Sequence, residues 1–197
     1  MIARIATGVI LGGLIIAALI YGPEWTGYAI IQFLMLFGAD EFYRMGLQDA
    51  PKHYRPTGVL AFGSIVAVTY WAPAWLPATF LIATLVLLCS VLFSSETVEK
   101  MGAHATVLLG GLLYLGATVA TLTDITHEPD QDGYKLMLIL FATVFFGDTG
   151  AFFFGKGIGG PKLYAKISPK KTWSGSVGGA ACSVGGFFLF NMLFPLK

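Results

Sequence analysis

The chain has 197 residues, of which 56% are hydrophobic and 12% charged, and its formal net charge is +1 at pH 7. Soluble globular domains carry about 25% charged residues, so this composition excludes an ordinary soluble protein. The strongly positive mean hydropathy instead indicates an integral membrane protein.

Long apolar runs follow one another along the chain. Most approach the roughly 20 residues that a helix needs to cross about 30 Å of hydrocarbon. The first run is predicted to be a retained helix and not a cleaved signal peptide, because residues 21–25 lack the small-residue cleavage pattern. We predict an all-α fold, a polytopic transmembrane helical bundle of about seven spanning helices, in which the short second and third runs tilt or borrow flanking residues. The runs are 5–21, 26–38, 57–72, 75–93, 104–122, 135–154 and 176–194.

The polar connections between these runs are too short to hold a soluble domain. We therefore predict that residues 1–197 form a single integral membrane domain. The longest connections are 39–56, 94–103, 123–134 and 155–175.

Basic residues gather in alternate connections. By the positive-inside rule, this asymmetry predicts that the N-terminus and the lysine-rich connection lie in the cytoplasm, and we expect a bacterial cytoplasmic membrane. The basic set is Arg4, Arg44, Lys52, Arg55, Lys100, Lys156, Lys162, Lys166, Lys170 and Lys171, whereas the opposite side holds Glu24, Asp124, Glu128, Asp130 and Asp132.

Asp148 lies inside the sixth apolar run, with glycines on both sides. A central acidic residue costs about 2.5–3.5 kcal/mol on insertion scales, so an intramembrane carboxylate is expected to face a cavity, a cation or a partner. It follows Lys135 by 13 residues, which is about 20 Å of helix and places it towards the cytoplasmic end. The alternative is a carboxylate that marks the helix end or pairs with Lys156.

The connection before the last run is rich in lysine, and Lys170 and Lys171 directly precede Thr172 and the predicted helix. Pro169 is expected to fix a turn, and Ser168, Thr172 or Ser174 could cap the helix. A helix N-terminus flanked by ammonium groups suits a phosphate. The alternative is that these lysines only set orientation and touch anionic headgroups.

Other residues are predicted to have structural roles. Small residues four apart in the last run, Gly175, Gly179 and Ser183, favour close helix packing. Glu41 and Arg44 are expected to form a local ion pair. The three histidines have no metal-like spacing, and each is predicted to be a solvated surface residue. They are His53, His104 and His127.

Four stretches together resemble the phosphatidate cytidylyltransferases, also called CDP-diacylglycerol synthases. Two adjacent ones carry most of the likeness: GDTGAFFFGKGIGGPKL at 147–163 and ISPKKTWSGSVGG at 167–179. RIATG at 4–8 and EFYRM at 41–45 precede them in the order that the family shows. The likeness covers essentially the whole chain.

The resemblance implies transfer of CMP from CTP to phosphatidate, which gives pyrophosphate and CDP-diacylglycerol, with Mg²⁺ as cofactor. Both substrates are polyanions, and such transfers depend on cations that position phosphates and neutralise developing charge. The expected partners are CTP, phosphatidate and the lipid bilayer, and no nucleic acid. The expected catalytic residues are Asp148, Lys170 and Lys171; Ser168, Thr172, Lys162 and Lys166 are expected to bind substrate, and Asp148 is also the expected metal ligand.

Two departures from the family pattern bear on activity. Ser174 stands where the family usually has Glu, and the family's aspartate-rich cytoplasmic loop lies further C-terminal than Lys197. A two-metal site needs several carboxylates, so we expect this chain alone to turn over slowly or not at all. A truncated product, one half of a split enzyme or an incomplete reading frame would each explain this, and a homodimer or a second chain could supply the carboxylates. The alternative function is a non-catalytic membrane protein that binds anionic lipid or a partner chain.

Overall fold

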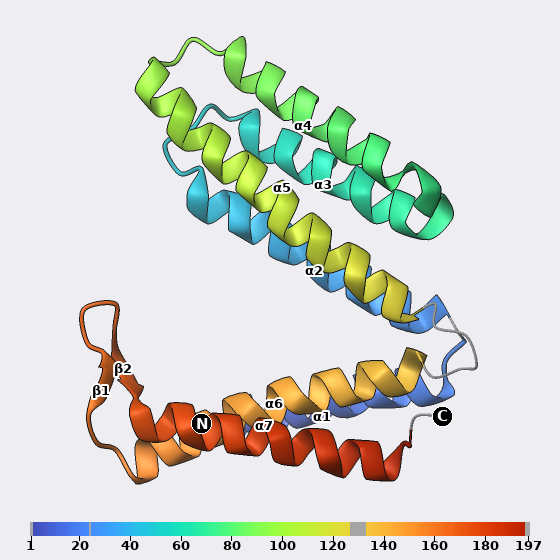
Figure 1. The fold of residues 1–197 in the computed structure, drawn as a ribbon, viewed down its shortest axis with the longest axis vertical. Coiled ribbons are helices and arrows are strands. Elements are labelled where there is room, and N and C mark those ends of the chain that lie inside the picture. Colours follow the sequence, from blue (N-terminus) through green and yellow to red (C-terminus); the bar gives the residue numbers. More distant parts are fainter. Residues whose placement is uncertain (1, 24, 127–132, 196–197) are drawn as a thin grey trace. The chain divides into compact units, whose positions relative to one another are not determined.

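Seven α-helices follow the seven apolar runs, which confirms the all-α prediction over the residues that the computed structural model describes, namely 2–23, 25–126 and 133–195 (Figure 1). Their bounds are α1 Ile2–Tyr21, α2 Trp25–Gly46, α3 Tyr54–Trp71, α4 Leu76–Leu92, α5 Val98–Thr126, α6 Gly133–Gly157 and α7 Trp173–Leu193. A 3₁₀ turn, η1 (Pro73–Trp75), leads into α4.

Within the described ranges, four helical segments are long and apolar enough to cross a membrane: Pro73–Leu92, Val98–Thr126, Gly133–Gly157 and Trp173–Leu193. In α1, the segment Gly12–Tyr21 is apolar but shorter than these four. The helices α2 and α3, which follow the two short apolar runs, are not among the four. The helix count therefore agrees with the prediction, while the number of spans stays a prediction.

The chain divides into two units, which are described separately. Unit 1 comprises residues 1–21 and 128–197, and unit 2 comprises residues 22–127.

Unit 2 is built from α2, α3, α4 and α5 around an apolar core. Its largest fully buried side chains include Tyr43, Phe62, Leu108 and Leu112. The Tyr43 hydroxyl donates to the Leu108 carbonyl oxygen at 3.2 Å. Such a bond is expected, because hydrocarbon offers a buried hydroxyl no water as partner.

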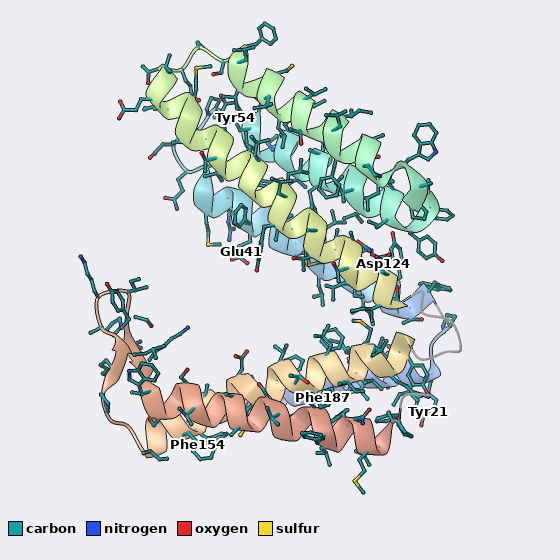
Figure 2. All side chains as sticks on the ribbon, in the orientation of Figure 1. Tyr21, Glu41, Tyr54, Asp124, Phe154 and Phe187 are labelled. Carbon is teal, nitrogen blue, oxygen red and sulfur yellow. The ribbon has the colours of Figure 1, made fainter. Side chains whose placement is uncertain are left out.

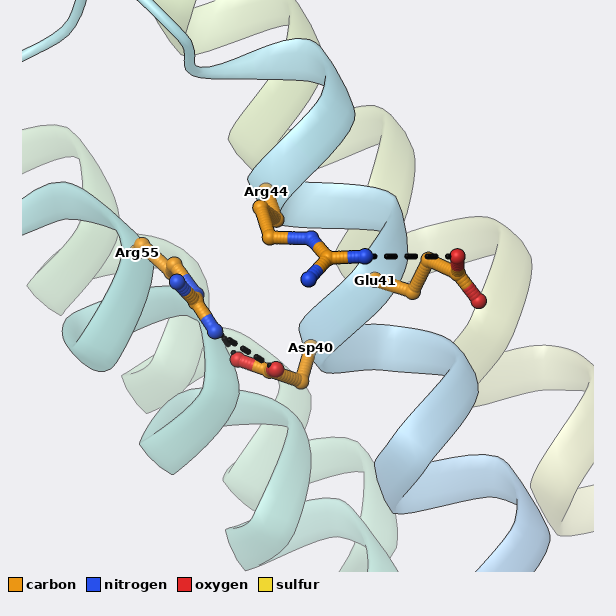
Figure 3. A network of polar contacts seen from close by, with 4 residues as sticks. All are labelled: Asp40, Glu41, Arg44 and Arg55. Carbon is orange, nitrogen blue, oxygen red and sulfur yellow. Dashed lines mark hydrogen bonds and ion pairs between the residues drawn. The ribbon is translucent and has the colours of Figure 1, made fainter.

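Two ion pairs lie near the C-terminal end of α2, one with α3 and one within α2 itself (Figure 3). The guanidinium of Arg55 at the start of α3 donates two hydrogen bonds to the Asp40 carboxylate, at 2.8 and 2.6 Å. Arg44 Nη2 and Glu41 Oε1 lie 3.5 Å apart on the same helix, which confirms the predicted local ion pair. Arg44 and Arg55 are therefore already engaged with carboxylates of this chain.

One histidine prediction is wrong. His104 is buried, and its Nδ1 lies 3.0 Å from Glu96 Oε2 in the connection between α4 and α5. Its ring also packs edge-on against Tyr54, a fully buried residue of unit 2 that is labelled in Figure 2. His53 is exposed as predicted, and His127 lies outside the described residues.

Unit 1 contains α1, α6 and α7, and its central feature is the close packing of α6 on α7. A Cβ atom added at Gly150 would lie 2.5 Å from Cys182 Sγ, and one added at Gly179 would lie 3.0 Å from the Gly147 carbonyl oxygen. The Ser183 hydroxyl donates to the Thr143 carbonyl oxygen across the same interface at 3.0 Å. The predicted packing role of the small residues in the last helix is thus confirmed.

Candidate active site

A β-hairpin connects α6 to α7, where the sequence alone had suggested only a polar connection. Its strands, β1 (Lys162–Tyr164) and β2 (Ser168–Thr172), pair antiparallel with Lys162 opposite Thr172. The predicted turn at Pro169 is wrong, because Pro169 lies within β2 and the chain reverses at residues 165–167. Both strands of this two-stranded sheet are edge strands, where a residue without an N–H to donate is tolerated.

The two ends of the hairpin are fastened together at the start of α7. Gly159 and Gly160 have φ values of +66° and +101°, in the left-handed region where a glycine is needed. The Ser174 hydroxyl donates to the Gly159 carbonyl oxygen, and the Trp173 N–H donates to the Pro161 carbonyl oxygen at 3.1 Å. These bonds fix the segment leaving α6 to the helix that follows the hairpin.

Thr172 is the N-cap of α7, one of the three candidates from the sequence. Its side-chain oxygen accepts from the Gly175 N–H at 3.2 Å and lies 3.1 Å from the Ser174 hydroxyl oxygen. Thr172 is buried, whereas Ser168 is half-buried at the start of β2. The described geometry therefore gives Thr172 a capping role, and contact of either hydroxyl with a phosphate stays a prediction.

The lysines predicted to be catalytic (Lys170 and Lys171) or to bind substrate (Lys162 and Lys166) all lie on this hairpin and are exposed. Within residues 133–195, none of these lysines forms an ion pair with a carboxylate. Their ammonium groups are thus available to an external anion.

Asp148 lies on α6, nine residues before the helix ends at Gly157, which is about 14 Å along the axis. Its neighbour Gly147 faces Ser183 of α7, whereas Asp148 itself is exposed on the flank of the helix. Lys156 does not pair with it, since its ammonium group lies over the ring of Phe152, 5.7 Å from the centroid. The structure thus brings the lysines together on one hairpin but joins none of them to Asp148.

The described residues contain no group of three or more His, Cys, Asp or Glu side chains able to hold a metal ion. Protein-bound Mg²⁺ usually takes one or two carboxylates together with substrate phosphates and water. Asp148 fits this pattern only as a single carboxylate ligand beside bound phosphates.

Sequence reasoning missed the fastening role of Ser174, although it had named this residue as a possible cap. The signal available was the pair of glycines at 159 and 160, which indicates a tight turn but not its partner.

Together these features define a polytopic helical membrane protein that presents a cationic hairpin between two closely packed helices. Comparison with protein families then gives the assignment. The model described as "Cytidylyltransferase family" matches residues 2–197, and the chain belongs to that family.

Several curated relatives are phosphatidate cytidylyltransferases. The protein of Brucella suis biovar 1 (strain 1330) is 36% identical over 116 residues, 59% of this chain and 41% of that protein. That of Rickettsia bellii (strain RML369-C) is 33% identical over 105 residues, 53% of this chain and 44% of that protein. The Staphylococcus saprophyticus protein is 43% identical over 58 residues, which cover 29% of this chain and 22% of that protein. The chain thus matches less than half the length of these relatives.

Proposed function

We propose that this chain carries the phosphate-binding part of a phosphatidate cytidylyltransferase, which transfers CMP from CTP to phosphatidate in phospholipid biosynthesis. The observation that carries the proposal is the exposed group of lysines on a fastened hairpin, in a chain that belongs to the cytidylyltransferase family. The substrate assignment is supported by the names of the relatives.

In this reaction a phosphate oxygen of phosphatidate attacks the α-phosphorus of CTP. The bond between the α-phosphorus and the oxygen bridging to the β-phosphorus breaks, and pyrophosphate leaves with that oxygen. Negative charge builds on the pyrophosphate as the bond breaks. Lys170 and Lys171 would bind and neutralise these oxygens, because ammonium groups stabilise charge that develops during phosphoryl-type transfer.

Lys162 and Lys166 would hold the second polyanion on the same hairpin. Asp148 would hold a magnesium ion or orient a lysine. Bound Mg²⁺ supplies charge neutralisation at the phosphates. The other carboxylates would come from a second copy of the chain or from a second chain.

We further propose that the protein resides in a bacterial cytoplasmic membrane with its N-terminus and the hairpin in the cytoplasm. The alternate distribution of Lys and Arg supports this orientation. It would place the hairpin where CTP is available.

The test is a binding and transfer assay on the purified chain, reconstituted with phosphatidate, magnesium and labelled CTP. Hydrogen bonds to charged groups contribute about 1.5–3 kcal/mol, so K170A/K171A should weaken CTP binding at least about tenfold. Lys100→Ala, an exposed lysine on α5, is the matched control and should bind CTP normally. Transfer of label into lipid should be slow or absent in the unmodified chain, and any transfer should fall in Asp148→Asn.

The alternative, a non-catalytic protein that binds anionic lipid or a partner, is favoured by the absence of a three-ligand carboxylate group from the described part of the chain. Nucleotide selectivity separates the two functions. A preference for CTP over the other nucleoside triphosphates supports the transferase, whereas equal or no binding of all four contradicts it. Rapid transfer by this chain alone would disprove our expectation that it needs further carboxylates.

A further inference from the structure

The hairpin segment exposes large apolar side chains as well as lysines. Ile167, in the turn between β1 and β2, is 81% exposed, and Tyr164 at the end of β1 is 55% exposed. Ile158, just after α6, and Trp173, at the first position of α7, are 70% and 55% exposed. All four lie between residues 158 and 173, and exposed apolar side chains that form one patch mark a contact surface more often than isolated ones do.

These apolar side chains lie in a segment with charge of one sign. Five lysines occur between residues 156 and 171, and neither Asp nor Glu occurs from residue 149 to residue 197. Tyr and Trp are enriched at the membrane–water interface, and lysine side chains can place their stems along apolar surface while the ammonium group stays at the headgroups. The segment has the composition of an element that lies in the interface of an anionic membrane.

The position of the hairpin agrees with this composition. It connects two of the helices that are long and apolar enough to span a membrane, so we expect its base at the membrane surface. Figure 1 shows β1 and β2 turning aside from the axes of α6 and α7 instead of continuing them. The bonds from Ser174 and Trp173 to residues 159 and 161 hold the base of the hairpin in this direction.

We propose that the β1–β2 hairpin docks onto the anionic surface of the protein's own membrane. Ile167 and Tyr164 enter the boundary between headgroups and acyl chains, Trp173 lies at the base of the docked hairpin, and Lys162 and Lys166 contact lipid phosphates. The occupant of this surface is a lipid leaflet, because a bilayer offers both the apolar layer that Ile167 requires and the phosphates that the lysines require. A free nucleotide offers only the phosphates.

This docking requires neither nucleotide nor catalysis, so it stands apart from the proposed transfer reaction. Its consequence is an elevated concentration of anionic phospholipid beside the lysines. Each lysine near an anionic leaflet should raise the docked-to-undocked ratio about fivefold, and salt should lower it through screening.

The experiment places an environment-sensitive fluorophore at the turn. Ile167→Cys, in a full-length background with Cys89→Ala and Cys182→Ala, is labelled and reconstituted into nanodiscs of phosphatidylcholine with or without phosphatidylglycerol. We expect a blue-shifted emission and quenching by brominated lipids in anionic discs, with both reduced in neutral discs and at 1 M salt, where the Debye length is only about 3 Å. Lys162→Gln/Lys166→Gln should lower the docked ratio about 25-fold. Asp49→Cys, an exposed position between α2 and α3, is the control and should keep a water-like emission.

A second measurement uses the unmodified chain and so does not depend on the folding of variants. Acetylation rates of the native lysines are compared between neutral and anionic nanodiscs by mass spectrometry, with Lys100 as the internal reference. We expect the hairpin lysines to be protected in anionic discs. Equal rates in both discs, a water-like emission at position 167, or a change that requires CTP instead of anionic lipid would each overturn the proposal. None of these readouts depends on transfer activity, so failure of the proposed function and failure of docking are distinguishable.

Discussion

Ser174 acts on the hairpin from outside its strands, since its hydroxyl bonds to the Gly159 carbonyl oxygen at the far end of the connection. A hydrogen bond of this kind contributes about 0.5–1.5 kcal/mol. Ser174→Ala should therefore increase local opening of the hairpin by up to about tenfold. Trypsin cleavage at the hairpin lysines of the reconstituted chain measures this opening. Ser176→Ala, an exposed serine in the same turn of α7, should leave the cleavage rate unchanged, and equal rates in both variants would contradict the role of Ser174.

The Glu96–His104 pair should make the stability of unit 2 depend on pH. Burial raises the pKa of Glu96, but its hydrogen bond with His104, the nearby Tyr54 hydroxyl and the charges of His104 and Lys100 outweigh burial, so its pKa lies below the usual 4.5. A depressed pKa means that the carboxylate stabilises the fold above pH 4.5 and that this contribution is lost as the pH falls through the lowered value.

Unfolding of the chain and of Glu96→Gln should be compared in detergent between pH 7 and pH 3. We expect the variant to be less stable at pH 7 and the difference to shrink in acid, because protonation removes the same interaction from the unmodified chain. Glu99→Gln, an exposed neighbour, is the control. A difference that stays constant with pH would show that the charge of Glu96 does not matter.

At the scale of the elements, the interface of α6 and α7 depends on glycines that leave no room for a side chain. A Cβ atom at Gly178 would collide with the Cβ and Cγ atoms of Phe154 (labelled in Figure 2). A Cβ atom at Gly185 on the same helix would have no neighbour within 4 Å. Gly178→Ala should therefore destabilise the helix pair by about 1–3 kcal/mol through overpacking. Gly185→Ala should be neutral or stabilising by up to about 1 kcal/mol, because alanine is the better helix former. Thermal unfolding followed by circular dichroism measures both, and the same shift in the two variants would refute the packing described.

The helices themselves were predictable, and the hairpin was not. The length of an apolar run and the flanking charges are local properties, and they predicted a helix at each of the seven positions. The helix α2 continues beyond its apolar run through Asp40, Glu41 and Arg44. The strands at 162–172 have short, lysine-rich sequences without the apolar–polar alternation that predicts a strand, so local sequence did not reveal their pairing.

At the scale of the whole molecule, the distribution of basic residues predicts that the end of α1 and the hairpin face opposite sides of the membrane. Single cysteines at Tyr21, which is 87% exposed, and at Ala165 in the hairpin turn test this in the cysteine-free background. A membrane-impermeant maleimide should label Ala165→Cys only in inside-out vesicles and Tyr21→Cys only in right-side-out vesicles. Labelling of both from one side would contradict the proposed orientation.

The sequence by itself determined the helical membrane class, the positions of seven helices and the family resemblance, because each depends on composition or on motifs that are continuous in the chain. It also singled out Thr172 as a candidate cap and the small residues of α7 as a packing surface. Only the tertiary structure decided that His104 is buried against Glu96, that Ser174 fastens Gly159, and that Asp148 stays apart from the lysines. The physical reason is that these outcomes depend on which side chains meet across separate elements, and local sequence patterns do not specify such contacts.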